Sequence, residues 1–186
     1  MSSSLNKANE SWMSPGAALK RFNAAQAKSG SLAGNSAEQT TTTQLRYGFR
    51  IGDIGLLIAP NIPSEALTHV PVYALPNTPD WFAGLGNLRG NIVPVYDLER
   101  LFVQQGGKEG RKYLIILGKG NDAVGITLQQ LPQAKRFDDS LLATERPPLP
   151  DLLEPHVSET YINGEEIWLA FDHSSFFKTL LKGTGQ

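Results

Sequence analysis

From Gln44 onward the chain consists of short apolar runs, each interrupted within a few residues by glycine, proline or asparagine. Runs of this length suit β-strands, whereas amphipathic helices need apolar residues at helical spacing over ten residues or more. The rhythm is typical of small barrels and sandwiches, so we expect a mainly β fold. At 186 residues the chain can bury the core of one domain, or of two small barrels that share a core.

Several apolar runs form pairs with the spacing of β-hairpins across glycine-containing turns. The paired strands are expected over residues 45–51 with 55–59, 113–117 with 123–128, and 161–162 with 166–171. A further strand is expected over 133–137. Strands are also expected over 70–75 and 91–96, where Pro71 and Pro94 favour a sheet edge or a bulge.

Two short helices are expected in the body of the chain. Asp80 is expected to cap a single helical turn over residues 81–83. A closing helix is expected over residues 175–182, capped by Asp172 or Ser174. Its expected apolar face consists of Phe176, Phe177, Leu180 and Leu181.

Residues 1–43 have a different texture, with small polar side chains and few apolar anchors, and we expect them to form a flexible N-terminal tail. Within it, Ser14 and Pro15 are typical of the start of a short helix, and Gly30 is typical of its end. Because Leu19 and Phe22 are the main apolar residues of its face, a transient helix is favoured over a helix that docks on a partner.

Composition restricts the possible partners. The chain has no cysteine, which fits a reducing compartment and excludes disulfides and thiolate sites. The formal net charge of -1 argues against nucleic acid as a partner. No run approaches the roughly 18 apolar residues of a membrane span, and residues 1–9 lack the apolar stretch of a signal peptide. We expect a cytoplasmic protein that does not insert into a membrane.

Residues 81–98 join a glycine-punctuated turn to an apolar strand and place a single arginine, Arg89, between them. The polar side chains of the block are those of Asn87, Arg89, Asn91, Tyr96 and Asp97. A catalytic loop combines a nucleophile, base or metal ligand with a second cooperating group, a pattern that this block lacks. An isolated guanidinium suits recognition of a partner's carboxylate or carbonyls. It also suits an internal ion pair that pins the loop, and both interpretations stay open.

Other patterns that could indicate chemistry are weak. Gly84, Gly86 and Gly90 resemble a dinucleotide fingerprint, but the spacing differs by one residue and the glycines precede a strand instead of following one. The three histidines lack the spacing of metal ligands, so we expect them to be solvated or to cap helices. The neighbours His173 and Ser174 suit helix capping better than nucleophilic catalysis. We expect neither a cofactor nor a metal ion.

The run Asn-Leu-Arg-Gly-Asn-Ile-Val-Pro-Val-Tyr-Asp-Leu over residues 87–98 resembles the signature of CheW-like chemotaxis coupling proteins. The resemblance extends to residues 77–84 and 124–126 and covers roughly residues 44–181. Residues 44–186 are therefore expected to form one CheW-like domain. The segments most similar to the PilI branch of the family, from type IV pilus twitching motility, are residues 48–50, 57–60, 147–149 and 168–171.

The resemblance implies a fold of two five-stranded SH3-like barrels packed around a shared core, with short helices that include a C-terminal one. It implies no enzymatic activity. Such proteins connect the cytoplasmic tip of a methyl-accepting chemoreceptor to the regulatory domain of a CheA-type histidine kinase. The expected function is thus that of an adaptor, recruited to membrane-associated receptor arrays and controlling twitching motility.

The resemblance also implies a receptor-binding groove around Arg89, because Glu65 falls where the family has an acidic residue able to pair with that arginine. The residues implied for the groove are Glu65, Gly84, Asn87, Leu88, Arg89, Gly90, Tyr113 and Leu114. It assigns no residue to kinase contact. Two alternatives remain: a stand-alone β-barrel module that binds a peptide or response regulator without a kinase, and a small enzyme using Asp97, Glu65 or His173.

Overall fold

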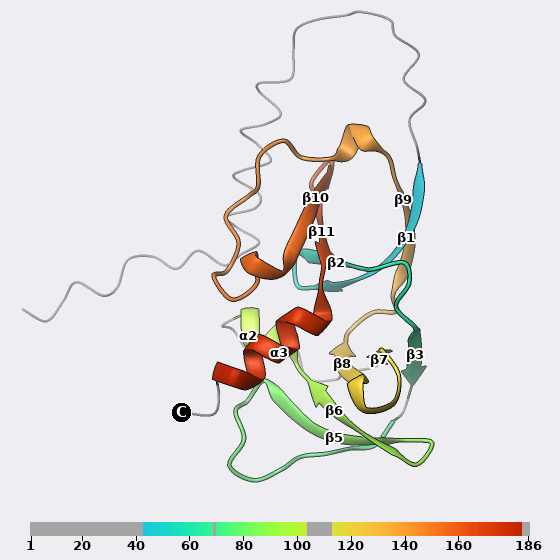
Figure 1. Ribbon diagram of the computed structural model, residues 1–186, viewed down its shortest axis with the longest axis vertical. Helices are drawn as coiled ribbons and strands as arrows, with labels where there is room; N and C mark the ends of the chain where they lie inside the picture. The colour runs from blue at the N-terminus through green and yellow to red at the C-terminus, as the bar shows by residue number, and fades with distance from the viewer. Residues whose placement is uncertain (1–42, 69, 104–112, 184–186) are drawn as a thin grey trace, which may run out of the picture.

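The computed structural model describes residues 43–68, 70–103 and 113–183 as two curled β-sheets with two α-helices beside them (Figure 1). The predicted tail lies outside the described residues except for Thr43, and so does the short helix predicted within it. His69 is likewise not described. The expected mainly β architecture with two barrels and a C-terminal helix is confirmed.

The first sheet has five strands in the order β10-β11-β2-β1-β9. Their bounds are β1 Gln44–Ile51, β2 Ile54–Ile58, β9 Gln133–Phe137, β10 Val157–Asn163 and β11 Glu166–Phe171. Two hairpins build most of it, as predicted, with turns at Gly52-Asp53 and Gly164-Glu165. The sheet combines both ends of the described chain, because β11 pairs with β2 in parallel and β9 pairs with β1 in antiparallel orientation.

The second sheet has six strands in the order β3-β7-β8-β6-β5-β4, one more than expected. Their bounds are β3 Ser64–Thr68, β4 Val72–Tyr73, β5 Phe82–Leu88, β6 Asn91–Tyr96, β7 Tyr113–Leu117 and β8 Val124–Leu128. The strand expected over residues 70–75 is present only as the two-residue β4, which forms one edge of the sheet. As expected, Pro71 lies next to an edge strand.

Three hydrophobic clusters explain how two small sheets make one domain. The largest contains residues from both sheets and from both α-helices, with Leu56, Leu98 and Leu169 fully buried. A second cluster, around Val95, lies within the second barrel. The third, around Trp168, lies within the first. The large cluster is the expected shared core, and it joins the barrels through side-chain packing.

Two short elements support the shared core. Helix α2, Leu98–Phe102, begins after Asp97, whose carboxylate accepts a hydrogen bond from the backbone N–H of Arg100. Helix α3, His173–Gly183, has Asp172 at its start, where the carboxylate accepts from the N–H of Ser175. The remaining helical turns are the 3-10 segments Gly120–Asp122, Asp139–Leu141 and Glu154–His156.

The expected apolar face of the closing helix is only partly correct. Phe176, Phe177 and Leu180 are buried in the shared core. Leu181, which we expected beside them, is 53% exposed. Residues 180 and 181 point about 100° apart on a helix, so the narrow seam that faces the sheets includes only the first of the two.

The predicted helical turn over residues 81–83 is wrong. The backbone N–H of Phe82 donates to the carbonyl of Pro79 and closes a turn, after which the chain enters β5. Pairing with β6 is irregular between Phe82 and Gly84, where glycine adopts a φ of 131°. At Pro94 a sheet edge or a bulge was expected. The edge is wrong, since β6 lies between β5 and β8, but the irregular pairing of β5 with β6 lies next to Pro94, and pairing with β8 begins only at Val95.

Candidate functional site

The most distinctive local structure is the turn of the β5–β6 hairpin. Leu88 pairs with Asn91, leaving Arg89 and Gly90 as a two-residue turn with φ values of 51° and 90°. Positive φ at both positions is the signature of the type I′ turn, which usually carries Asn-Gly. The side-chain oxygen of Asn87 accepts a hydrogen bond from the N–H of Gly90 at 2.9 Å. The turn therefore fixes the direction in which Arg89 leaves the sheet.

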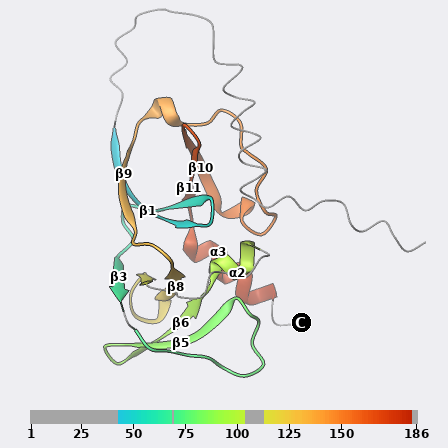
Figure 2. The same ribbon diagram turned by 180° about the vertical axis from the view of Figure 1, so that it is seen from behind.

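Arg89 forms the ion pair that the resemblance implied. Its Nη2 donates to Oε1 of Glu65 at 2.6 Å, with 75% of the arginine and 38% of the glutamate side chain exposed. Glu65 lies on β3, which is hydrogen-bonded only to β7 within the sheet. The ion pair thus connects the β5–β6 turn to β3, a strand that is not adjacent to β5 or β6 in the sheet. β3 lies on the right in Figure 1 and on the left in Figure 2.

A groove of about 390 Å³ lies beside this ion pair, and residues of the second sheet and its loops line it. Val93, Ile116 and Ala123 form its apolar floor, and all three are buried in the second cluster. The remaining lining residues come from β3, from the β5–β6 hairpin and from the β7–β8 loop. They are Pro63, Ser64, Glu65, Leu88, Arg89, Asn91, Gly118, Lys119 and Gly120.

The structure brings together part of the implied groove. Glu65, Leu88 and Arg89 line it, while Asn87 and Gly90 shape the turn at its rim. Leu114 is buried in the second cluster beneath. The other two implied residues lie elsewhere and do not line the groove.

Gly84 and Tyr113 occupy positions with structural explanations. A Cβ on Gly84 would lie 2.1 Å from the carbonyl oxygen of Tyr73, so this glycine permits β4 to approach β5. Tyr113 pairs with Thr68 at the end of the β3–β7 ladder, three residue pairs from Glu65. Its side chain packs against the shared core.

Sequence reasoning missed the contribution of the β7–β8 loop. The segment Gly118-Lys119-Gly120 begins the turn expected between residues 117 and 123, and this turn does connect β7 to β8. The N–H of Gly118 also donates to the carbonyl of Pro63 at 2.9 Å, which holds the loop beside the start of β3. No local pattern in the sequence indicates this contact, because it joins segments more than fifty residues apart.

The groups considered for catalysis have other roles. Asp97 caps α2, and Glu65 is paired with Arg89. Of the two roles expected for the histidines, solvated residue or helix cap, the first is wrong for His156 and His173, which are 6% and 4% exposed. His156 Nδ1 lies 2.8 Å from Ser175 Oγ and thereby fastens α3 to the preceding 3-10 turn. Burial lowers the pKa of His173. Among the described residues, no group of three potential ligands could hold a metal ion.

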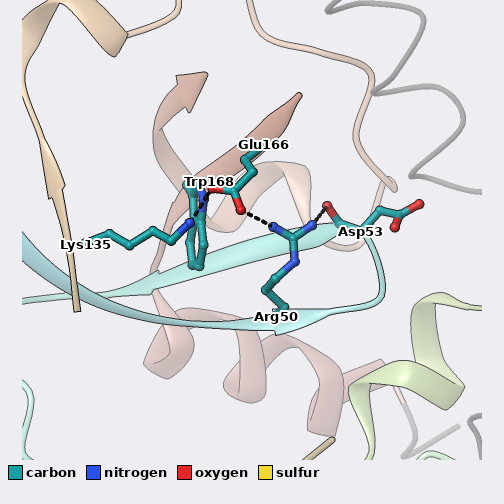
Figure 3. A network of polar contacts seen from close by, with 5 residues as sticks. All are labelled: Arg50, Asp53, Lys135, Glu166 and Trp168. Carbon is teal, nitrogen blue, oxygen red and sulfur yellow. Dashed lines mark hydrogen bonds and ion pairs between the residues drawn. The ribbon is translucent and has the colours of Figure 1, made fainter. Parts of the chain in front are cut away.

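A second polar network surrounds the Trp168 side chain in the first barrel (Figure 3). Glu166 contacts Lys135 and lies 3.7 Å from Arg50, and it accepts a hydrogen bond from Trp168 Nε1. Both cations also lie near the Trp168 ring, with Lys135 Nζ 4.8 Å from its centroid. The hydrogen bond from Lys135 lowers the pKa of Glu166. Since Trp168 is 1% exposed, this network serves the barrel core.

The fold and groove define a class of protein. A family model for the CheW-like domain matches residues 49–180, which is more than half of the chain. The chain therefore belongs to the CheW-like family, a family of scaffold and adaptor proteins. No helix among the described residues is long and apolar enough to cross a membrane.

Particular relatives come from several signalling systems. Chemotaxis protein CheW of Helicobacter pylori is 27% identical over 72% of this chain and 79% of its own length. Protein FrzA of Myxococcus xanthus is 28% identical over 64% of this chain and 69% of its own. Protein PilI of Pseudomonas aeruginosa is 25% identical, over 67% and 70% respectively. The crystal structure of the scaffolding protein TtCheW from Thermoanaerobacter tengcongensis matches the fold with a TM-score of 0.58 at 19% identity, covering 74% of this chain and 94% of that chain.

Proposed function

We propose that this chain is a non-enzymatic adaptor that couples a transmembrane chemoreceptor to a histidine kinase. The observation that carries the proposal is the groove beside Arg89 and Glu65, found in a chain of the CheW-like family. Its apolar floor and polar rim suit a protein segment. Glu65 is the acidic residue among those that line the groove, and its carboxylate is already paired with Arg89. The lining therefore offers no pair of groups for acid and base catalysis.

An adaptor needs a second surface, and the outer face of β4, β5 and β6 offers one. Tyr73, Leu85 and Pro94 are successive partners across these strands and so share a face. Ile92 lies two residues from Pro94 and therefore points the same way. Tyr73 and Ile92 are 65% and 63% exposed. We assign the groove to the receptor tip and this apolar face to the regulatory domain of the kinase.

The two surfaces would be coupled through the packed interior. A shift in receptor packing at the groove would reach the kinase contact through the second barrel and the shared core. Allosteric coupling of about 1 to 3 kcal/mol is enough to change kinase output several-fold. Each contact can be weak on its own, because a membrane-associated array of receptors and kinases supplies avidity.

The pathway we propose is type IV pilus twitching motility. The similarity to PilI supports it, and FrzA and CheW show that related chains serve more than one system. In the native cell, a tagged copy of the chain should capture a chemoreceptor and a histidine kinase together, and both should be encoded beside pilus genes. Capture of a response regulator with neither receptor nor kinase would instead support the stand-alone module.

Two substitutions test the assignment of the faces. Arg89→Asn removes the guanidinium but keeps a residue that tolerates the left-handed turn, so folding should be preserved. It should reduce receptor capture while kinase capture persists, because the Glu65 carboxylate in the groove lining loses its partner. Ile92→Glu should do the reverse, since it adds a charge to the apolar face. The measurement is quantitative mass spectrometry of tagged captures, with circular dichroism to verify folding. Unchanged capture of both partners by folded Arg89→Asn would refute the role of the groove.

A further inference from the structure

The charges that line the groove do not balance. Glu65, Arg89 and Lys119 are its charged lining residues, and Glu65 and Arg89 neutralise each other at 2.6 Å. Within the described parts of the chain Lys119 makes no ion pair, and it is exposed. The groove therefore presents an apolar floor beside one uncompensated positive charge.

The position of Lys119 on the rim is well defined by its backbone. Gly118 and Gly120 on either side adopt positive φ values of 86° and 59°. A Cβ on Gly118 would lie 2.9 Å from the carbonyl oxygen of Asp122, so the loop packs tightly on itself. The hydrogen bond from Gly118 to Pro63 then ties this loop to the start of β3. Lys119 is thus held in the groove lining near the start of β3, and its long side chain can reach over the floor.

We propose that Lys119 determines the specificity of the groove by selecting a partner segment in which an aspartate or glutamate side chain lies beside an apolar one. The apolar side chain occupies the floor formed by Val93, Ile116 and Ala123, and the carboxylate pairs with the Lys119 ammonium. The inference rests on the proposed function, and the occupant to which it commits is the cytoplasmic tip of the receptor.

Charge complementarity separates this role from that of Arg89. Arg89 is satisfied within the chain, so a partner carboxylate at the turn would meet Glu65 as well and be repelled. Lys119 offers a partner carboxylate no such competitor among the charged lining residues. Rim charges contribute mainly to selectivity and to the salt dependence of association. An acidic receptor tip should therefore bind more weakly as ionic strength rises.

The test measures binding of a soluble cytoplasmic fragment of a methyl-accepting chemoreceptor from the same organism to the full chain. Lys119→Gln should weaken binding about three-fold and Lys119→Glu about ten-fold, with a smaller salt dependence for Lys119→Gln. Lys178→Glu is the matched control, because Lys178 is an exposed lysine on α3, away from the groove lining. It should bind like the unmodified chain.

Rescue completes the test. A receptor fragment in which one tip glutamate or aspartate is replaced by lysine should regain affinity for Lys119→Glu, which identifies the paired residue. Equal binding by the unmodified chain, Lys119→Gln and Lys119→Glu would overturn the role of Lys119 and leave the proposed function intact. Failure of the unmodified chain to bind any receptor fragment would overturn the proposed function and this inference together.

Discussion

At the scale of single residues, Gly84 and Gly90 show how one residue type serves two different needs. Both have positive φ, but only Gly84 faces a close backbone neighbour, since nothing lies within 4 Å of a Cβ on Gly90. Gly84→Ala should therefore lower the free energy of unfolding by more than about 2 kcal/mol, and Gly90→Ala by about 1 kcal/mol.

Urea denaturation at constant m-value measures both changes. Equal effects of the two substitutions would show that β4 can move away from Gly84 without cost. The comparison also bears on the groove, because the sequence resemblance placed Gly84 within it. If the structural explanation is correct, a folded Gly84→Ala chain should keep its affinity for the receptor fragment.

Single residues also show what the sequence could and could not predict. The Arg89–Glu65 pair was implied by the family resemblance, and the structure contains it. Lys119 was not inferred, because its place on the groove depends on a backbone contact with Pro63 across distant segments. Burial of His156 was likewise invisible, since its partner Ser175 is separated by nineteen positions.

At the scale of elements, α3 begins with a buried histidine whose charged form is disfavoured. The pKa of His173 is lower in the folded chain because burial outweighs the opposing effect of Asp172. Above about pH 6.5 the His173 imidazole is neutral in both the folded and the unfolded chain, so it adds no pH dependence to the free energy of unfolding. As pH falls below that value, the unfolded state gains a proton that the folded state resists, and stability decreases.

His173→Gln should remove this part of the acid sensitivity. The urea concentration at the midpoint of unfolding should fall less between pH 7.5 and pH 5.5 in His173→Gln than in the unmodified chain. His156 is present in both proteins, so the difference between the two slopes isolates His173. Identical slopes would mean that α3 loosens enough for the imidazole to reach water before the chain unfolds.

The β1–β2, β7–β8 and β10–β11 hairpins were predicted, because their turn residues and apolar runs lie within one short window, whereas β5 was not predicted as a strand. The error at residues 81–83 arose because Asp80 has the chemistry of a helix cap, while the pairing of β5 with β6 decides the conformation. β3 was not predicted at all. Its alternating exposed and half-buried residues, which include Glu65, carry little hydrophobic signal.

At the scale of the whole molecule, the decisive feature is that each sheet depends on distant parts of the chain. β9 follows β8 directly in sequence but crosses to the first sheet and pairs with β1. β11 returns to pair with β2. Hairpin signals cannot encode such crossovers, so the two-barrel arrangement followed from the family resemblance instead of from local patterns.

These crossovers predict that the two barrels unfold together. Phe177 of α3 is 3% exposed, and its ring centroid lies 4.4 Å from that of Tyr96 on β6. It packs in the shared core with residues of both sheets. Phe177→Ala should cost about 3 to 5 kcal/mol and shift a single transition that involves the entire domain.

The readout combines far-UV circular dichroism with fluorescence from Trp168, which is buried in the first barrel. Replacing Trp12 and Trp81 by phenylalanine leaves Trp168 as the chain's single tryptophan. Both signals should move to the same lower urea midpoint in Phe177→Ala. If Trp168 keeps its midpoint while the dichroism splits into two transitions, the barrels are independent. The shared core could then not transmit a change at the groove to the kinase.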